Sequence, residues 1–231
     1  MKYTRQSLGI KCSTCPVKRT CLARDLEPNE ANWLDQTIQY AKIFEPGEYL
    51  FKANSPVSNA LAIHSGSCKE YALDSIGIEY VNKFSWPGDV LGLEYIDKGI
   101  HAFNVIATEK TTVCLLPIEL LTQPKYFFTQ RIFHILCDKL RDLQKYPQTT
   151  NAKKRVAIFF LELIKRHTKK YLVVNIPLHI SQVDISHHIG IANETLSRIL
   201  SEFAQQGIVV IKKHCICALN MMLLQELIGS S

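Results

Sequence analysis

The sequence predicts an α+β protein in which a β-roll, or double-stranded β-helix, is followed by a long helix and a winged helix-turn-helix domain. Short β-rich runs punctuated by Pro-Gly and Gly fill the first half of the chain, and a helical pattern follows them. The stretch 180–213 then combines two short helical patterns with a β-hairpin pattern. We expect four parts: an N-terminal arm (1–28), a β-roll (29–123), a long helix (124–147) and the winged domain (148–231).

The composition is that of a folded globular protein. The chain has 231 residues, of which 47% are hydrophobic and 21% charged, and no apolar run approaches the length of a membrane span. The first residues, MKYTRQSLGIKC, lack the apolar core of a signal peptide, so we expect a cytoplasmic protein with no membrane partner. Eight cysteines in that compartment argue against a disulfide scaffold and favour metal ligands, reactive thiols or small core residues.

Three of these cysteines lie within ten residues of one another in the arm. Cys12, Cys15 and Cys21 have the spacing C-x2-C-x5-C, which lets three thiols converge on one metal centre that still needs a fourth ligand. From the spacing alone, both zinc and an iron–sulfur cluster remain possible. Nearby cations are expected to lower the pKa of the thiols. These cations are Lys11, Lys18, Arg19 and Arg24.

The region from Ala41 to about Pro117 predicts a β-roll or a barrel-like sandwich, after a helix at 29–40. Its strand-forming runs recur at short intervals between turn residues. Cys114 lies inside the last of these runs, where a cysteine is usually a small core residue. The expected strands are Tyr49 to Phe51, Leu61 to Ile63, Cys68 to Ala72, Glu79 to Lys83, Asn104 to Ala107 and Thr112 to Leu116.

The next segment, from Pro124 to Tyr146, has helical periodicity and a narrow apolar stripe, and Pro147 ends it. Such a stripe suits a two-stranded parallel coiled coil between identical subunits, although an ordinary core helix would show the same pattern. The expected dimer-interface residues are Ile132, Leu136, Leu140 and Leu143.

After a helix at 155–166, residues 180–213 predict a helix-turn-helix. Ser181 is expected to cap the first helix and Gly190 to end it. The second helix buries one apolar stripe and presents a polar one, as a reader of the DNA major groove does. A guanidinium can bind guanine, a carboxylate can accept from cytosine, and a serine hydroxyl can serve either role. We expect the DNA-binding residues Ser181, Asn193, Glu194, Ser197 and Arg198.

A β-branched run at 208–211 leads to Lys212 and Lys213 and predicts a β-hairpin wing whose lysines face phosphate. Residues 151–231 contain ten Lys and Arg against five Asp and Glu, so they supply +5 of the net charge of +6. A basic excess in this region suits binding to double-stranded DNA, although a solvated basic face would show it too. A dimer would then place two recognition helices on a palindromic operator.

This order of parts resembles the Crp/Fnr family of bacterial transcription regulators, and within it the oxygen-responsive FNR branch. The motif Glu194-Thr195-Leu196-Ser197-Arg198 matches the E-T-x-S-R pattern of that branch. The resemblance implies a cyclic-nucleotide-binding-like β-roll, half-sites like TTGAT, a homodimer and RNA polymerase as a protein partner. It argues against an enzyme, and no nucleophile–base constellation or phosphate-binding glycine loop is visible.

The arm cysteines and Cys114 match the four cluster ligands of that branch. The resemblance therefore implies a [4Fe–4S] cluster on Cys12, Cys15, Cys21 and Cys114, which would sense oxygen or nitric oxide and control dimerisation. A regulator of the same fold with a zinc site or a thiol switch is the alternative. No cyclic nucleotide is expected, because no arginine lies between Arg24 and Arg131 to hold its phosphate.

Overall fold

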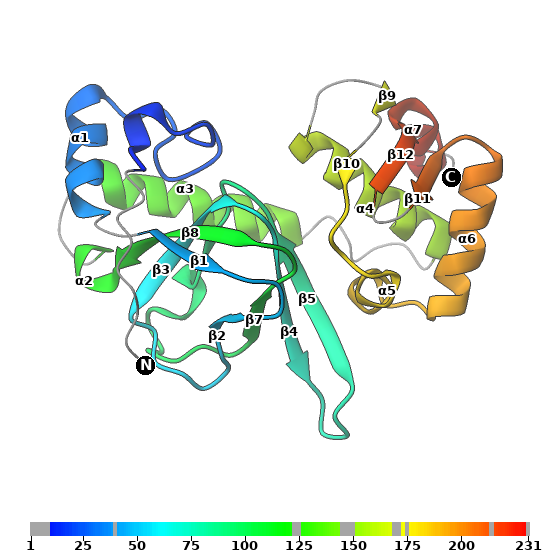
Figure 1. The fold of residues 1–231 in the computed structure, drawn as a ribbon, viewed down its shortest axis with the longest axis horizontal. Coiled ribbons are helices and arrows are strands. Elements are labelled where there is room, and N and C mark those ends of the chain that lie inside the picture. The colour runs from blue at the N-terminus through cyan, green and yellow to red at the C-terminus, as the bar shows by residue number, and fades with distance from the viewer. Residues whose placement is uncertain are drawn as a thin grey trace. The chain divides into compact units, whose positions relative to one another are not determined.

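The computed structural model forms two compact units, Met1–Arg141 and Asp142–Ser231, which Figure 1 shows as a ribbon. The second unit therefore begins at the end of the predicted long helix, and most of that helix belongs with the β-roll. No helix in the described part of the chain has both the length and the apolar character to cross a bilayer. The structure describes residues 10–38, 41–121, 126–143, 151–167, 172–173, 176–212 and 215–229.

The first unit is built on two four-stranded antiparallel sheets with the strand orders β1-β8-β3-β6 and β2-β7-β4-β5. This confirms the predicted β-roll, with two further strands, β1 and β6, that the sequence pattern did not indicate. The strands are β1 (Ala41–Phe44), β2 (Tyr49–Phe51), β3 (Asn59–Ser65), β4 (Cys68–Leu73), β5 (Glu79–Ser85), β6 (Val90–Leu91), β7 (Asn104–Ala107) and β8 (Thr111–Pro117).

The sheet that contains β3 and β8 is buried on both faces. Side chains alternate along a strand, so Leu61 and Ile63 point into the core between the two sheets while Ala60 and Ala62 point out of its other side. Cys114 shares that outer side, since it pairs with Ala62 in the ladder. The core between the sheets consists of Phe44, Leu61, Ile63, Cys68, Leu91, Val105, Ala107 and Val113.

The outer side of this sheet is covered by the arm, by helix α1 (Pro28–Thr37) and by helix α3 (Tyr126–Leu143). Helix α1 begins where Glu27 and Glu30 form a reciprocal capping box, with Pro28 in its first turn. A short 3₁₀ turn, η1 (Cys12–Thr14), packs beside α1. This second core consists of Leu22, Ala23, Leu34, Ala60, Ala62, Val90, Leu93, Cys114 and Leu116.

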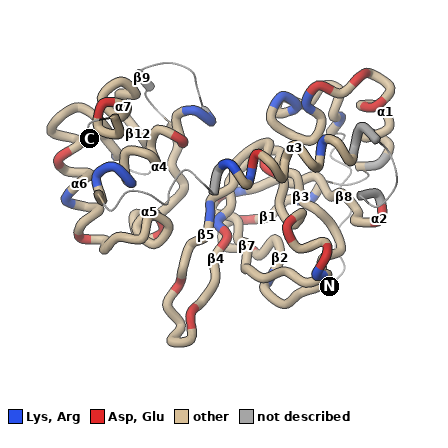
Figure 2. The backbone as a smooth tube through the Cα atoms, turned by 180° about the vertical axis from the view of Figure 1, so that it is seen from behind, with Lys and Arg blue, Asp and Glu red and all other residues tan. Residues whose placement is uncertain are grey.

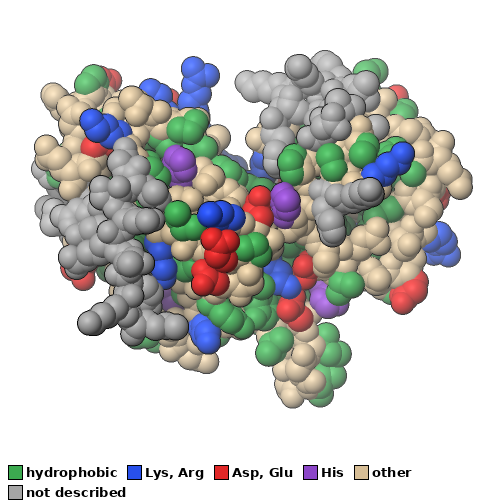
Figure 3. Space-filling model, viewed as in Figure 1, with side chains coloured by type: hydrophobic (Ala, Val, Ile, Leu, Met, Phe, Trp, Pro, Cys, Tyr) green, Lys and Arg blue, Asp and Glu red, His purple; other side chains and the backbone are tan. Residues whose placement is uncertain are grey.

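Two short helical segments complete the first unit, η2 (Leu93–Tyr95) after β6 and α2 (Ile118–Leu121) after β8. The β4–β5 hairpin extends beyond the rest of its sheet, and Figure 3 shows hydrophobic side chains gathered at its tip. The large exposed side chains there are Leu73, Ile76, Ile78 and Tyr80.

The second unit is a winged helix-turn-helix, as predicted. Ser181 Oγ accepts a hydrogen bond from the Asp184 N–H at 3.0 Å and so caps α5, and Gly190 ends that helix in the left-handed conformation at φ 70°. Arg155 of α4 donates to the carbonyl oxygens of Ile189 and Gly190 at 2.9 and 3.2 Å, which fixes the turn. The elements are α4 (Ala152–His167), β9 (Leu172–Val173), β10 (Ile176–Pro177), α5 (Gln182–Ile189), α6 (Asn193–Gln205), β11 (Val209–Lys212), β12 (Cys215–Asn220) and α7 (Met221–Gly229).

Candidate metal centre and nucleic-acid interface

The four cysteines singled out in the sequence line one cavity between the arm and the outer side of the β3–β8 sheet. Cys114 reaches it from β8 and is 7% exposed, while the three arm cysteines approach it from the other side and are partly exposed. Most of the remaining lining is apolar, with Leu22 and Leu34 among the contributors. The arm therefore lies within reach of Cys114, although the two are about 100 positions apart in the sequence.

Two contacts hold the arm in place. Asp35 of α1 accepts hydrogen bonds from the Cys12 backbone N–H and, at 3.1 Å, from the Ser13 hydroxyl. Thr20 packs directly on Gly88, in the turn between β5 and β6, where any Cβ would collide with the threonine side chain. Gly88 also has φ +98°, a conformation that favours glycine. The arm is thus anchored near both ends of the cysteine motif.

The structure corrects the expectation that neighbouring cations lower the pKa of the thiols. Burial raises the pKa of Cys114 to about 12, and the thiols of Cys21 and Cys15 beside it add to the shift. Burial likewise raises the pKa of Cys21 to about 11, although backbone N–H groups oppose it. For Cys12 the same desolvation is reinforced by Asp35 and by the other thiols. Burial outweighs the flanking charges, because the cationic side chains remain in solvent.

This donor set fits an iron–sulfur cluster in kind and number. Four thiols on an apolar cavity are the ligands that a [4Fe–4S] cluster takes, each bound to a different iron. The free space in this cavity is about 20 Å³. Among the described residues, no three His, Cys, Asp or Glu side chains are arranged to hold a single metal ion.

Helix α3 packs on the same core as the arm. Ile132, Ile135 and Leu136 lie against the cluster of buried side chains that contains Leu22 and Cys114. An ion pair adds a direct link, since Arg131 lies 3.6 Å from the Asp25 carboxylate, four residues after Cys21. Any displacement of the arm therefore changes the surface against which α3 rests.

The other face of α3 carries exposed apolar side chains. Phe133 and Leu140 are 63% and 61% exposed and lie two turns apart on that face. Of the residues predicted for a dimer interface, Leu140 is exposed there, while Ile132 and Leu136 also pack against the core. The side chain of Leu143 lies outside the described residues. The exposed apolar side chains of α3 are thus Phe133 and Leu140. The sequence pattern alone did not distinguish them from the apolar residues of α3 that pack against the core.

A group of charged side chains ties α3 to the β-roll. Lys139 of α3 lies 2.6 Å from Glu94 and also donates to the Val90 carbonyl oxygen at 2.6 Å. Lys83 of β5 lies 2.6 Å from the same Glu94 carboxylate. Burial alone would raise the pKa of Glu94, but the two ammonium groups lower it to about 2.

Replacing Glu94 by glutamine should therefore destabilise the first unit by about 2 kcal/mol at neutral pH, because Lys139 loses its carboxylate and Lys83 keeps only Glu70, at 3.5 Å. The folded-state pKa lies below the ordinary value of 4.5, so the wild-type contribution is complete above about pH 4.5 and is lost as the pH falls toward 2. Denaturant unfolding followed by tryptophan fluorescence measures this, because the chain's two tryptophans, Trp33 and Trp86, both lie in this unit.

The matched control for this prediction is Asp97→Asn. Asp97 lies in the following loop and faces Lys98 at 3.7 Å, with both side chains at least 70% exposed, so little stability should be lost. Equal stability of Glu94→Gln and wild type between pH 5 and pH 7 would refute the assigned role of this ion group.

The recognition helix, α6, buries Leu196, Ile199, Leu200 and Phe203 and exposes its polar side. Asn193, Glu194, Ser197 and Arg198 are all exposed on its first two turns. These residues lie where a helix entering the major groove presents its side chains to base edges. Figure 2 shows the basic and acidic positions of the chain interspersed along the backbone.

The structure describes two of the three remaining residues predicted for DNA binding. Lys212 is exposed at the end of β11, on the wing, whereas Lys213 lies outside the described residues. Ser181 is exposed, but its hydroxyl already serves as the cap of α5. Because the oxygen of Ser181 acts as an acceptor in this cap, its O–H group can still donate a hydrogen bond to a DNA phosphate.

Sequence reasoning missed two residues that the structure places beside this core, Asp35 and Lys139. Asp35 has no signal in the sequence, because a carboxylate on the polar side of a short helix is ordinary. Lys139 did have one: it stands at position i+7 from Ile132 and i+4 from Ile135, on the side of α3 that packs against the core. A lysine on a core-facing stripe predicts a buried partner, here Glu94.

The comparisons with known proteins agree with this architecture. Residues 41–123 match the family model of the cyclic nucleotide-binding domain, and residues 154–227 match that of the Crp-like helix-turn-helix domain. The solved structure of FixK2 from Bradyrhizobium japonicum is similar to this chain with a TM-score of 0.72 and 25% identity, covering 83% of this chain and 98% of that one.

Full-length relatives have regulatory names. The fumarate and nitrate reduction regulatory protein of Vibrio cholerae is 30% identical over 232 residues, covering 96% of this chain and 92% of the relative. An anaerobic regulatory protein of Pasteurella multocida is 28% identical, covering 96% of this chain and 84% of the relative. The chain therefore belongs to the Crp/Fnr family, whose members are DNA-binding transcription regulators rather than enzymes.

Proposed function

We propose that this regulator is of the FNR type and uses a [4Fe–4S] cluster on Cys12, Cys15, Cys21 and Cys114 to sense oxygen or nitric oxide. The main support for this proposal is that the four thiols come from two segments distant in sequence and line one largely apolar cavity. A cluster bound there would supply oxygen-labile iron–thiolate bonds between the arm and β8. The relatives named for anaerobic regulation and for fumarate and nitrate reduction support the same signal.

The chain's own residues suggest how the signal reaches the DNA. The arm and α3 share one apolar core, and Asp25 of the arm pairs with Arg131 of α3. An arm held against β8 keeps that core closed and α3 in one position, so that Phe133 and Leu140 can meet a second copy. A homodimer then presents two α6 helices to a palindromic operator with TTGAT-like half-sites, from which it contacts RNA polymerase.

The main alternative is a thiol switch or a zinc site in the same fold. A thiol switch needs a thiolate near neutral pH, and burial disfavours one at two of the four cysteines, since it raises the pKa of Cys21 to about 11 and of Cys114 to about 12. A zinc site would use the same thiols, and metal analysis of the purified protein distinguishes it from a cluster. We also expect no cyclic nucleotide to act here, because residues 88–94 lack the arginine that would pair with its phosphate.

Anaerobic purification tests the proposal. We expect about four iron and four sulfide per chain and a brown chromophore that air bleaches. On exposure to air, the mass of the protein in solution should fall from that of a dimer to that of a monomer. A colourless preparation loaded with zinc would overturn the cluster, while the family and its DNA-binding role would stand.

Replacing Arg198 by alanine should weaken binding to the cognate operator by about 1–3 kcal/mol per half-site and relax preference at one base pair. The guanidinium is exposed on α6, where it can donate to guanine O6 and N7. Titrations of labelled operators that differ at each position measure the preference. An equal loss on random duplex DNA would contradict base reading by Arg198.

A further inference from the structure

One side of the recognition helix faces an open pocket against the start of α4. Its lining includes Lys153 of α4 together with Arg198 and Glu202 of α6. Lys153 Nζ lies 2.6 Å from Glu202 Oε1, and Gln206 donates to the same oxygen at 3.3 Å. Glu202 thus accepts hydrogen bonds from both Lys153 and Gln206.

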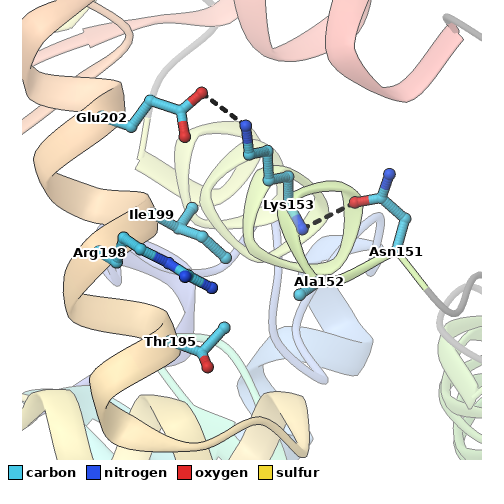
Figure 4. A pocket seen from close by; sticks show the side chains of 7 residues that line it. All are labelled: Asn151, Ala152, Lys153, Thr195, Arg198, Ile199 and Glu202. Carbon is cyan, nitrogen blue, oxygen red and sulfur yellow. Dashed lines mark hydrogen bonds and ion pairs between the residues drawn. The ribbon is translucent and has the colours of Figure 1, made fainter.

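Glu202 would otherwise be a natural partner for Arg198. The two residues are four positions apart on one helix, so their side chains are neighbours on its surface. Figure 4 shows the Glu202 carboxylate turned toward Lys153, while the Arg198 guanidinium extends separately into the pocket. No ion pair joins Arg198 to Glu202 in the part of the chain that the structure describes. The Lys153 hydrogen bond lowers the pKa of Glu202, and the nearby charge of Arg198 adds a smaller contribution to the shift.

The backbone of Lys153 is itself fixed. Its backbone N–H donates to Asn151 Oδ1 at 2.9 Å, so that Asn151 caps the first turn of α4. Helix α4 is anchored in turn by Arg155, which donates to the carbonyl oxygens at the end of α5. The ammonium group therefore approaches α6 from a rigid element rather than from a loop.

We propose that Lys153 is a positioning residue for sequence reading: by holding Glu202, it leaves the Arg198 guanidinium free to bind guanine in the operator. This inference rests on the proposed role of Arg198 as a base reader. Without Lys153, Glu202 would compete with guanine for the Arg198 guanidinium at both half-sites of a dimer. The loss of preference would be confined to the base pair that Arg198 reads.

The test compares two labelled duplexes, a palindrome with two TTGAT half-sites and the same palindrome with TTAAT half-sites, using anaerobically purified full-length protein. Lys153→Met should reduce the discrimination between them by about two- to fivefold, the size of an exposed i, i+4 pairing counted twice. Lys153→Arg should retain the discrimination. The double variant Lys153→Met, Glu202→Gln should recover it, because the uncharged amide that replaces the carboxylate no longer attracts Arg198.

Lys154→Met is the matched control, because it removes the same charge from the same turn but does not line the pocket. Its discrimination should equal that of the wild type. Lys153 would instead be a plain phosphate contact if Lys153→Met weakened binding to both duplexes equally and reduced the salt dependence. Failure of the double variant to recover would also overturn the proposal. If the wild type itself showed no preference for TTGAT over random DNA, the proposed function would fail, and this result is separate from the variants.

Discussion

Replacing Cys114 by serine is expected to abolish iron and sulfide binding and to leave a monomer with about a thousandfold weaker affinity for the operator. Cys114 is the one predicted ligand that the β-roll supplies, so its loss leaves the arm cysteines without a partner on the sheet. A monomer would contact one half-site, and the gap between specific and non-specific binding is at least of this size. Iron and sulfide analysis, sedimentation mass and operator titration under anaerobic conditions measure the three effects.

Cys68→Ser provides the matched control for that variant. Cys68 is also buried on a strand, at 1% exposed, and burial raises its pKa to about 12 in the same way. It lies in the core between the two sheets rather than in the cysteine cavity. A buried hydroxyl costs both variants a similar stability, about 1–3 kcal/mol. A Cys114→Ser protein that keeps its full iron content would refute the ligand assignment.

The second large effect is expected at the exposed side of α3. Introducing glutamate at both Phe133 and Leu140 should abolish dimerisation while the cluster remains bound. Both side chains are more than 60% exposed and lie on one face, so in a twofold seam the new carboxylates would lie close to their counterparts. Operator affinity should fall to the non-specific level, as for a monomer. Sedimentation and iron analysis of the same sample separate this loss from loss of the cluster.

His134→Glu is the control on the same helix. His134 is exposed but lies about a quarter turn or more away from Phe133 and Leu140 around the helix axis. The variant should remain dimeric in the presence of the cluster. Dimerisation of the Phe133→Glu, Leu140→Glu protein would show that the subunits associate through a different surface.

The DNA-binding unit was predictable from the sequence because its signals are local. The cap at Ser181, the stop at Gly190 and the apolar spacing of α6 each depend on a few neighbouring residues, and the structure confirms all three. The strand runs of the β-roll were found in the same way, apart from β1 and the two-residue β6.

The parts that could not be predicted depend on which surfaces meet. Helix α3 has apolar residues on two sides, and periodicity alone could not tell that Ile132 and Ile135 rest on the core while Phe133 is exposed. The pKa values of the thiols of Cys12 and Cys21 are raised, whereas the flanking cations led us to expect lower values. Burial of these thiols comes from tertiary packing and outweighs the charges next to them in sequence.

The sheet that contains β3 and β8 separates two kinds of mutant phenotype. Inward residues such as Ile63 and Val113 belong to the core between the sheets, and enlarging or truncating them should lower the amount of folded protein in the cell. Their immediate neighbours Ala62 and Cys114 face the arm. In a genetic screen, mutations that abolish the response to the signal and mutations that lower the amount of protein should therefore fall at alternating codons of the same strand.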